Sequence, residues 1–122
     1  ERLTRVRSSL RTEVARAPRR RIVEEALARQ GALLLADTRE EALAFARDYA
    51  AEHLALFTAN PHADLDAVPT AGTVFLGEAA AVAYGDYITG ANHVLPTGGA
   101  ARFSSPLGVY DFVTRSSVIS YT

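Results

Sequence analysis

Glu52 and His53 stand side by side between a predicted helix and the strand expected after it. A histidine can act as a general base near neutral pH, and the neighbouring carboxylate can tune it or act separately on water. A solvent-exposed helix end, where the helix dipole favours histidine, accounts for the same pair without any chemistry. Taken alone, the pair favours this simpler interpretation. Its place before a strand adds to that, because ligands of open α/β sheets usually bind beyond the carboxyl ends of the strands.

Asp86 and His93 lie in a stretch rich in glycine and proline, residues 85–106. Both are zinc-ligand types, and catalytic zinc sites often combine three protein ligands with water or substrate. Their separation is not a compact ligand spacing, so a turn-capping aspartate and a hydrogen-bonded polar histidine are an open alternative. Long loops without regular structure are usually functional or disordered. Apolar side chains lead us to expect an ordered, functional loop anchored by Val94, Leu95 and Phe103.

Two other features could bind anions but have simpler explanations. Thr97-Gly98-Gly99 could hold an anion with its backbone N–H groups, yet it matches neither the dinucleotide-binding pattern nor the P-loop. Its glycines are better explained by a backbone that needs positive φ or close approach. Eight arginines between Arg2 and Arg21 could neutralise phosphates, but no aromatic residues interleave with them. We interpret them as the solvated face of an amphipathic helix and expect no nucleic-acid partner.

The composition limits the class of protein. The 122 residues suffice for one domain or part of one, with 48% apolar residues and a formal net charge of -1. The chain has no cysteine, which excludes disulfide scaffolds, thiol nucleophiles and cysteine-ligated zinc. No apolar run is long enough to span a membrane, and we expect a cytoplasmic protein without a membrane partner. Because the sequence has no methionine and opens on Glu1, we expect it to be an internal piece of a longer chain.

Apolar periodicity predicts helices that alternate with short strands. Helices are expected from the start to about Ala17, over Arg19–Gln30, from Thr38, over Ala63–Ala67, over Glu78–Tyr84 and near Val109–Thr114. Strands are expected at Ala32–Ala36, Leu54–Thr58, Thr73–Leu76 and Val118–Tyr121. Thr38 and Glu41 fit a capping box, in which each side chain bonds a free backbone N–H of the other residue.

This order of elements predicts an α/β fold with a layered helix/sheet/helix architecture. Residues 1–122 are expected to form a single segment. Within it, residues 1–30 are a helical lead-in, and residues 31–122 form the sheet with the candidate active-site loop at 85–106.

Residues 85–99, from Gly85-Asp86-Tyr87 to Thr97-Gly98-Gly99, resemble the most characteristic segment of the histidinol dehydrogenase family. Five shorter stretches continue the resemblance: 49–54, which is similar to the family's Glu-His motif, 71–77, 101–105, 107–109 and 111–112. The resemblance covers nearly the whole chain and is weakest before Gly31.

The resemblance implies an enzyme that oxidises L-histidinol to L-histidine through an aldehyde-level intermediate, with NAD as hydride acceptor and zinc in the site. It implies that His53 is the base for the alcohol proton and that Glu52 activates water for the second oxidation. Asp86 corresponds to a zinc ligand that also lies against the substrate. His93 corresponds to a residue that lines the substrate site with His53 and Asp86. It further implies an incomplete Rossmann-like domain and an intertwined homodimer of the intact protein.

The chain departs from the family pattern in three ways. Ala51 stands where the family usually has proline. The family's remaining zinc ligands, a Gln and a His upstream and a His downstream, do not occur in these residues. No residue corresponds to the nucleotide contacts, so none is assigned to cofactor binding. A second interpretation therefore stays open: a truncated homologue that acts as a non-catalytic binding or interaction module. The flanking coding sequence would distinguish the two.

Overall fold

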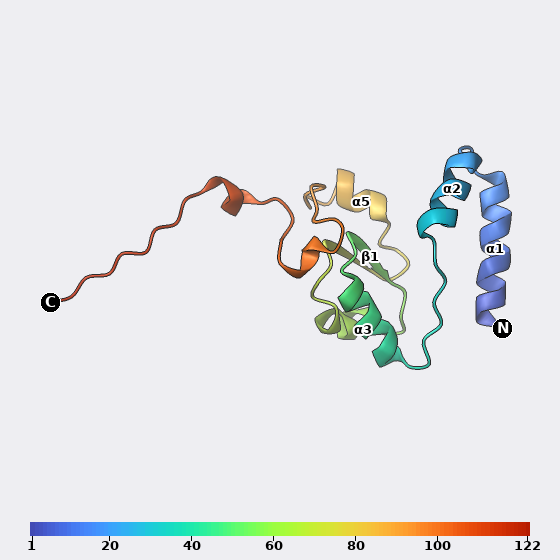
Figure 1. Cartoon of the computed structure of the whole chain (residues 1–122), viewed down its shortest axis with the longest axis horizontal. Helices are drawn as coiled ribbons and strands as arrows, with labels where there is room; N and C mark the ends of the chain where they lie inside the picture. Colours follow the sequence, from blue (N-terminus) through green and yellow to red (C-terminus); the bar gives the residue numbers. More distant parts are fainter. The chain divides into compact units, whose positions relative to one another are not determined.

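The computed structural model describes residues 1–122 and separates them into two compact units, Glu1–Asp37 and Thr38–Thr122 (Figure 1). The first unit is helical, and the second contains the sheet. None of the helices has both the length and the apolar character needed to cross a bilayer.

Two helices make up most of the first unit. α1 spans Arg2–Arg16 and α2 spans Arg20–Gln30, close to the predicted ranges. Pro18 separates them, because its ring excludes it from a helix interior and keeps the residue before it extended. α2 ends where Gly31 donates its N–H to the Leu27 carbonyl, and a Cβ on Gly31 would lie 2.6 Å from that oxygen. Gly31 is therefore the predicted stop, and glycine permits the close approach.

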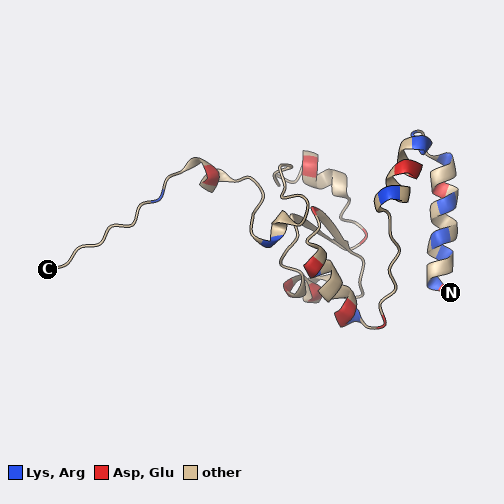
Figure 2. Ribbon diagram, in the orientation of Figure 1, with Lys and Arg blue, Asp and Glu red and all other residues tan.

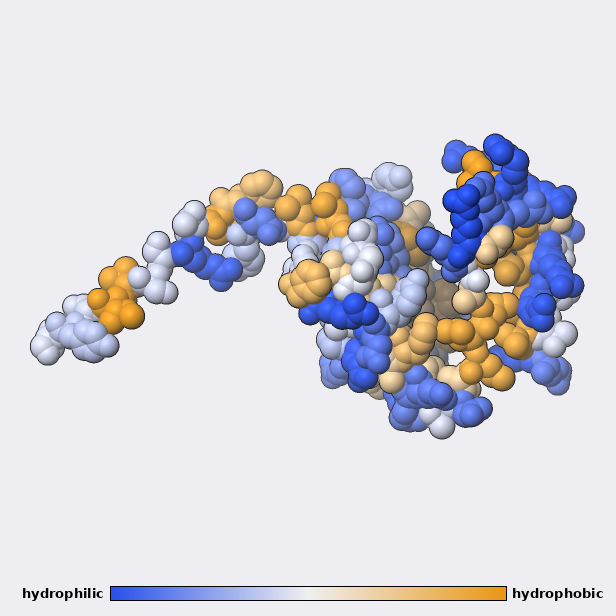
Figure 3. Space-filling model, viewed as in Figure 1, coloured by the Kyte–Doolittle hydropathy of each residue, from blue (hydrophilic) through white to orange (hydrophobic).

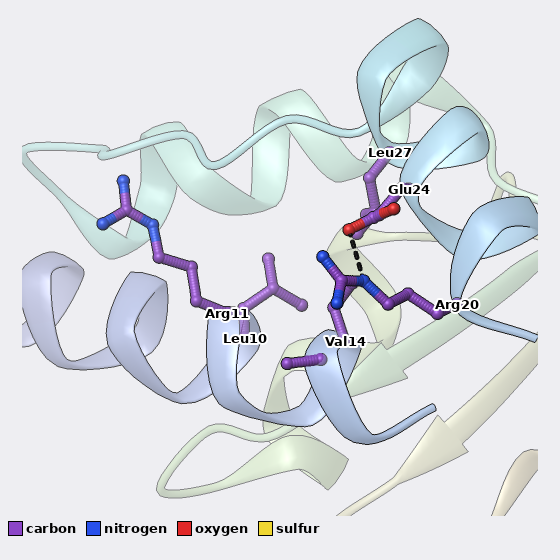
Figure 4. Close-up of a pocket in the computed structure, with 7 residues that line it drawn as sticks. Leu10, Arg11, Val14, Arg20, Glu24 and Leu27 are labelled. Carbon is purple, nitrogen blue, oxygen red and sulfur yellow. Dashed lines mark hydrogen bonds and ion pairs between the residues drawn. The ribbon is translucent and has the colours of Figure 1, made fainter. Parts of the chain in front are cut away.

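A hollow lies between α1 and α2, lined in part by the apolar side chains of Leu10, Val14 and Leu27 (Figure 4). Arg20 and Glu24, which also line it, form an ion pair at 2.8 Å. No residue of either helix is buried. The apolar faces of the two helices are thus only partly covered within this unit.

The strand predicted at Ala32–Ala36 is wrong. Residues 31–36 form no helix or strand, and Leu33, Leu34 and Leu35 are 43%, 61% and 77% exposed. The sheet has two strands, neither of them from this segment. A continuous apolar run becomes a buried strand only when neighbouring strands pair with its backbone and helices cover its faces.

The final strand predicted at Val118–Tyr121 is also wrong. Residues 113–122 form no helix or strand, and every one of them is exposed. Figure 3 shows apolar side chains in orange on this terminal segment, where Val118 and Ile119 are 91% and 77% exposed. No strand pairs with the segment, so its β-branched residues lack the cross-strand partners that stabilise a sheet.

In the second unit, α3 spans Arg39–Tyr49 and begins where the capping pattern predicts. The Thr38 side chain accepts a hydrogen bond from the Glu41 N–H at 3.1 Å, which is the first half of the predicted capping box. At the other end, Ala50 is buried and adopts the left-handed conformation, with φ of 53°. This reversal turns the chain out of the helix and toward Glu52 and His53.

Two segments distant in the sequence are hydrogen-bonded to the C-terminal end of α3. The Thr70 hydroxyl donates to the Arg47 carbonyl, and the Arg102 guanidinium donates to the Asp48 carbonyl. The last carbonyls of a helix have no partner within it. These bonds therefore satisfy the helix end and hold the segment before the second strand and the end of the 85–106 loop against it.

β1 (His53–Leu56) and β2 (Thr73–Leu76) form a parallel pair, with His53 opposite Thr73. β2 has the predicted bounds, whereas β1 begins one residue earlier and ends two residues earlier than predicted. Parallel strands need a crossover connection, and residues 57–72 provide it.

The remaining helical elements are short. They are α4 (Pro61–Asp64) and η1 (Leu65–Ala67) in the crossover, α5 (Val82–Tyr87) after β2, and the 3₁₀ turns η2 (Ala100–Arg102) and η3 (Val109–Phe112). α5 begins four residues later than predicted, because the residues after Gly77 form turns in which the Ala80 N–H bonds the Gly77 carbonyl. Gly85 and Asp86, predicted to lie in the loop, therefore belong to a helix.

The two-stranded sheet has helical structure on each face. One face packs with α3 and the end of η1 in a single apolar cluster: Leu43, Ala46, Leu54, Leu56, Val68, Val74 and Leu76. On the other face, Phe75 lies against His53 and against Gly85 of α5. Side chains alternate between the faces of a strand, which separates the two sets. The predicted helix/sheet/helix layering is confirmed around a sheet of two strands.

Candidate active site

His53 opens β1 on the face that carries α5. Its side chain is 31% exposed, and its imidazole lies on the ring of Phe75, with the centroids 6.1 Å apart and the ring planes at 26°. Phe75 is itself buried in β2. The stacking restrains the plane of the imidazole and leaves its two nitrogens to neighbours at the ring edge.

Two carboxylates flank this imidazole. Glu52 Oε1 lies 3.8 Å from Nδ1, and Asp86 Oδ1 lies 3.9 Å from Nε2. Both distances are longer than a hydrogen bond, and Nε2 is buried without a hydrogen-bond partner. Nε2 is therefore a buried polar atom beside a carboxylate with no hydrogen bond from the chain, which is uncommon in folded proteins.

The backbone at Glu52 is held by a neighbouring glycine. Gly72 donates its N–H to the Ala51 carbonyl and Thr73 donates to the Glu52 carbonyl, each at 2.9 Å. A Cβ on Gly72 would lie 2.6 Å from the Glu52 carbonyl oxygen, so glycine is required for this approach. Gly72 is not among the predicted site residues. Its signal was a glycine directly before a strand, a place where another backbone often comes close.

Asp86 reaches His53 by way of α5. The buried Gly85 lies against the Phe75 ring, and the next residue carries its carboxylate to the imidazole edge. The Asp86 side chain is 35% exposed. The cluster of Glu52, His53 and Asp86 thus forms over a face of the sheet at the amino end of β1. The position of Glu52 and His53 before the strand counted against a functional site in the sequence. In the structure, α5 packs over that face of the sheet and brings Asp86 to His53.

His93 does not join this cluster. Its side chain is exposed, and no hydrogen bond or ion pair links it to Glu52, His53 or Asp86. Three of the four predicted site residues therefore form one cluster, and the fourth, His93, makes no hydrogen bond or ion pair with it.

The Asn92 side chain makes two hydrogen bonds within the loop after α5. The Asn92 amide donates to the Leu107 carbonyl, and its side-chain oxygen accepts the Val94 N–H, both at 2.7 Å. Of the three predicted apolar anchors, Val94 and Phe103 are 49% and 84% exposed, whereas Leu95 is half-buried beside the buried Pro96. Asparagine is a common turn residue because its side chain can bond the backbone two residues further on. This preference is the signal by which Asn92 could have been found in the sequence.

Asp64 is the one buried charged side chain of the chain, and the Arg39 guanidinium bonds its Oδ1. The Thr58 hydroxyl and the Arg39 guanidinium lower the pKa of Asp64 from its ordinary value of 3.8, against burial, which raises it. The same hydrogen bond raises the pKa of Arg39. The pair joins the first residue of α3 to the end of α4 and lies outside the candidate site.

A zinc site would need more ligands than this cluster offers. No group of three or more His, Asp or Glu side chains in residues 1–122 is arranged to hold a metal ion, and catalytic zinc usually takes three protein ligands. The Asp86 carboxylate is a suitable oxygen donor beside the unbonded His53 nitrogen. These residues by themselves do not make a zinc site, and they fit one ligand position of a larger one.

The fold and the cluster define a segment of an α/β protein with a candidate acid–base site. The family model described as histidinol dehydrogenase matches residues 1–122. The chain therefore belongs to the histidinol dehydrogenase family, and the predicted resemblance is confirmed.

Similar proteins agree with this assignment. The histidinol dehydrogenase of Dechloromonas aromatica (strain RCB) is 46% identical over 117 residues, which are 96% of this chain and 27% of that protein. That of Bacillus subtilis (strain 168) is 43% identical with the same coverage of each chain. The crystal structure of histidinol dehydrogenase from Elizabethkingia anophelis matches with a TM-score of 0.75 and 37% identity, over 82% of this chain and 23% of that chain. The chain thus spans about a quarter of the length of these relatives.

Proposed function

We propose that this chain is the acid–base segment of a zinc- and NAD-dependent histidinol dehydrogenase, which oxidises L-histidinol to L-histidine in histidine biosynthesis. The observation that carries the proposal is the His53 imidazole between the carboxylates of Glu52 and Asp86, with its nitrogens 3.8 and 3.9 Å from their oxygens. Family membership supports the substrate, and the cluster contains the groups that a two-step oxidation of an alcohol needs.

His53 is the base of the first oxidation. When the carbinol carbon loses its hydride, the alcohol proton must leave as well, and the His53 imidazole, which is 31% exposed, accepts it. The product is the aldehyde.

Glu52 is the base of the second oxidation. Its side chain is 42% exposed, so water can reach it. It takes a proton from water as the water oxygen bonds the aldehyde carbon, which gives a tetrahedral anion. Loss of the second hydride from this anion gives the carboxylic acid, which releases its proton to solvent as the carboxylate forms. Two adjacent bases thus serve two separate proton transfers.

Asp86 is the proposed zinc ligand, and His53, Asp86 and His93 are proposed to contact the substrate. Zinc, when bound, offers a binding position for the amine and imidazole nitrogens of histidinol, and NAD, when bound, accepts hydride. The ligands that complete the metal site and the residues that bind NAD would lie outside these 122 residues. We further propose that the intact protein is a cytoplasmic homodimer and that this segment belongs to a Rossmann-like domain.

The roles of the two bases are tested in the complete enzyme with His53→Ala and Glu52→Ala. General acid–base groups contribute about 10²–10⁴-fold to rate. With histidinol as substrate, His53→Ala is expected to lower kcat by that order. With the aldehyde as substrate, Glu52→Ala is expected to be the more damaging variant. NADH absorbance reports both reactions.

Matched controls are His62→Ala and Glu78→Ala, which make the same changes at exposed positions outside the cluster. Both are expected to retain the wild-type kcat with either substrate. Equal, small losses for the His53 and Glu52 variants on the two substrates would show that the pair is structural.

The 122 residues by themselves are expected not to oxidise histidinol, because Asp86 is one proposed ligand where zinc needs about three. The measurement is NADH formation with histidinol, NAD and zinc supplied. Sustained turnover above background would contradict the proposal that the site is completed elsewhere. Histidinol binding without turnover by the complete protein would instead support the non-catalytic binding module.

A further inference from the structure

Phe75 is the aromatic residue at the centre of the face that carries the candidate site. It is 6% exposed and occupies the third position of β2. One contact of its ring is the His53 imidazole, stacked at 6.1 Å. Another is the backbone of α5 at Gly85. The ring therefore lies between the element that carries the proposed base and the element that carries the proposed metal ligand.

The packing of the Phe75 ring against α5 explains why residue 85 is a glycine. A Cβ on Gly85 would lie 2.9 Å from Phe75 Cζ and 3.1 Å from Cε1. Glycine is the least favourable residue in a helix interior apart from proline, so a glycine within a six-residue helix calls for a packing reason. The absence of a side chain is that reason, since it lets the helix backbone rest directly on the aromatic edge.

The two contacts of the Phe75 ring involve or adjoin residues of the proposed site. The residue stacked on it is His53, and the residue after Gly85 is Asp86, whose Oδ1 lies 3.9 Å from His53 Nε2. Neither side chain is bonded to the other, so no hydrogen bond sets this separation. The Phe75 ring is the side chain that contacts both elements on this face of the sheet, through His53 and through Gly85.

We propose that Phe75 is a positioning residue: its ring is the spacer that sets the separation of His53 and Asp86, and Gly85 is the glycine that this spacer requires. The effect on catalysis rests on the function proposed above. The role of Phe75 as a spacer concerns packing alone, so it can be tested without measuring turnover.

The test is a size exchange in the complete enzyme, with Gly85→Ala, Phe75→Leu and the double variant. Ordinary contact begins at 3.4 Å, so the new Cβ at 2.9 Å forces the helix or the ring to move by about 0.5 Å. Because a misplacement of about 1 Å can reduce rate by about 10²-fold, Gly85→Ala is expected to lower kcat for histidinol by about 10-fold. Leucine removes the atoms that the Cβ would meet, so the double variant is expected to exceed Gly85→Ala alone in kcat by several fold.

Two readouts do not depend on turnover. The crystal structures of the variants give the distance from His53 Nε2 to Asp86 Oδ1, which should change in Gly85→Ala and return toward 3.9 Å in the double variant. The melting temperature of Gly85→Ala should fall and that of the double variant should recover. Ala83→Gly is the control, because it weakens the same helix at an exposed position away from the ring, and its kcat should equal that of the wild type.

The proposal is overturned if Gly85→Ala keeps the wild-type kcat, distance and melting temperature, or if the two single losses add in the double variant. Rescue of all three quantities by Phe75→Leu supports it, as does recovery of folding by the double variant when Gly85→Ala alone does not fold. A wild-type enzyme that does not oxidise histidinol would refute the proposed function, whereas the distances and melting temperatures would still decide whether Phe75 is the spacer.

Discussion

The two units use the same local signals and reach different degrees of burial. In Glu1–Asp37, both helices follow the predicted pattern, yet no helical residue is buried. In Thr38–Thr122, four-residue strands and short helices contribute the buried hydrophobic core: Leu43, Ala50, Leu56, Val68 and Phe75. Amphipathic periodicity thus suffices to form a helix. A core requires several elements, because a side chain becomes buried only when side chains of other elements pack against it.

Charge divides along the same boundary. The first unit has nine arginines and five acidic residues, and the second has four arginines and nine acidic residues (Figure 2). The candidate site, with two carboxylates around an imidazole, lies in the acidic unit. An acidic surrounding favours the approach of a cation, which agrees with the proposed amine substrate. The basic helices carry no group of the proposed chemistry.

The largest difference between the units is expected from the same truncation made in each. Leu56→Ala in β1 removes a side chain that is 5% exposed, within the cluster formed by Leu43 and Val68, and such losses destabilise by about 2–5 kcal/mol. Leu10→Ala in α1 removes one that is 38% exposed, for which about 0.5–1 kcal/mol is expected. Hydrogen exchange of the full chain, followed separately over residues 2–30 and 53–76, measures both.

The two leucine variants are each other's control, because the chemical change is identical. Equal losses in the two regions would mean that the α1 face is as well covered as β1, and the comparison between the units would fail.

A smaller effect is expected at Asp64, and only in the second unit. Its lowered pKa means that the carboxylate contributes stability above its ordinary pKa of 3.8 and that this contribution is lost as the pH falls through the folded-state value. Asp64→Asn is therefore expected to be less stable than the wild type at pH 7, with a difference that shrinks on acidification below about pH 4. Urea denaturation of both proteins across that range tests the expectation.

Asp66→Asn provides the control, because it removes the same charge at an exposed position two residues further on. Its stability should follow that of the wild type at each pH. A constant difference between Asp64→Asn and the wild type from pH 7 down to pH 2 would show that ionisation of Asp64 makes no contribution through Arg39 and Thr58.

Local chemistry determined a large part of this structure. The breaks at Pro18 and Gly31, the Thr38 cap and the bounds of β2 all follow from the sequence, because each depends on backbone groups within a few residues. The family was also recognisable, since the segment from Gly85 to Gly99 is long and specific. Residue types alone left the roles of Glu52, His53 and Asp86 open, and the resemblance to the family assigned them acid–base and metal chemistry.

Only the tertiary structure decided what lies beside what. The apolar runs at Ala32–Ala36 and Val118–Tyr121 have strand composition but no partner strand, and composition cannot specify one. Likewise, no spacing rule places Asp86 within 3.9 Å of a residue 33 positions earlier. That separation arises where α5 crosses Phe75, and it depends on the absence of a side chain at Gly85. Contacts between distant segments are set by shape complementarity at close range, which a linear pattern does not contain.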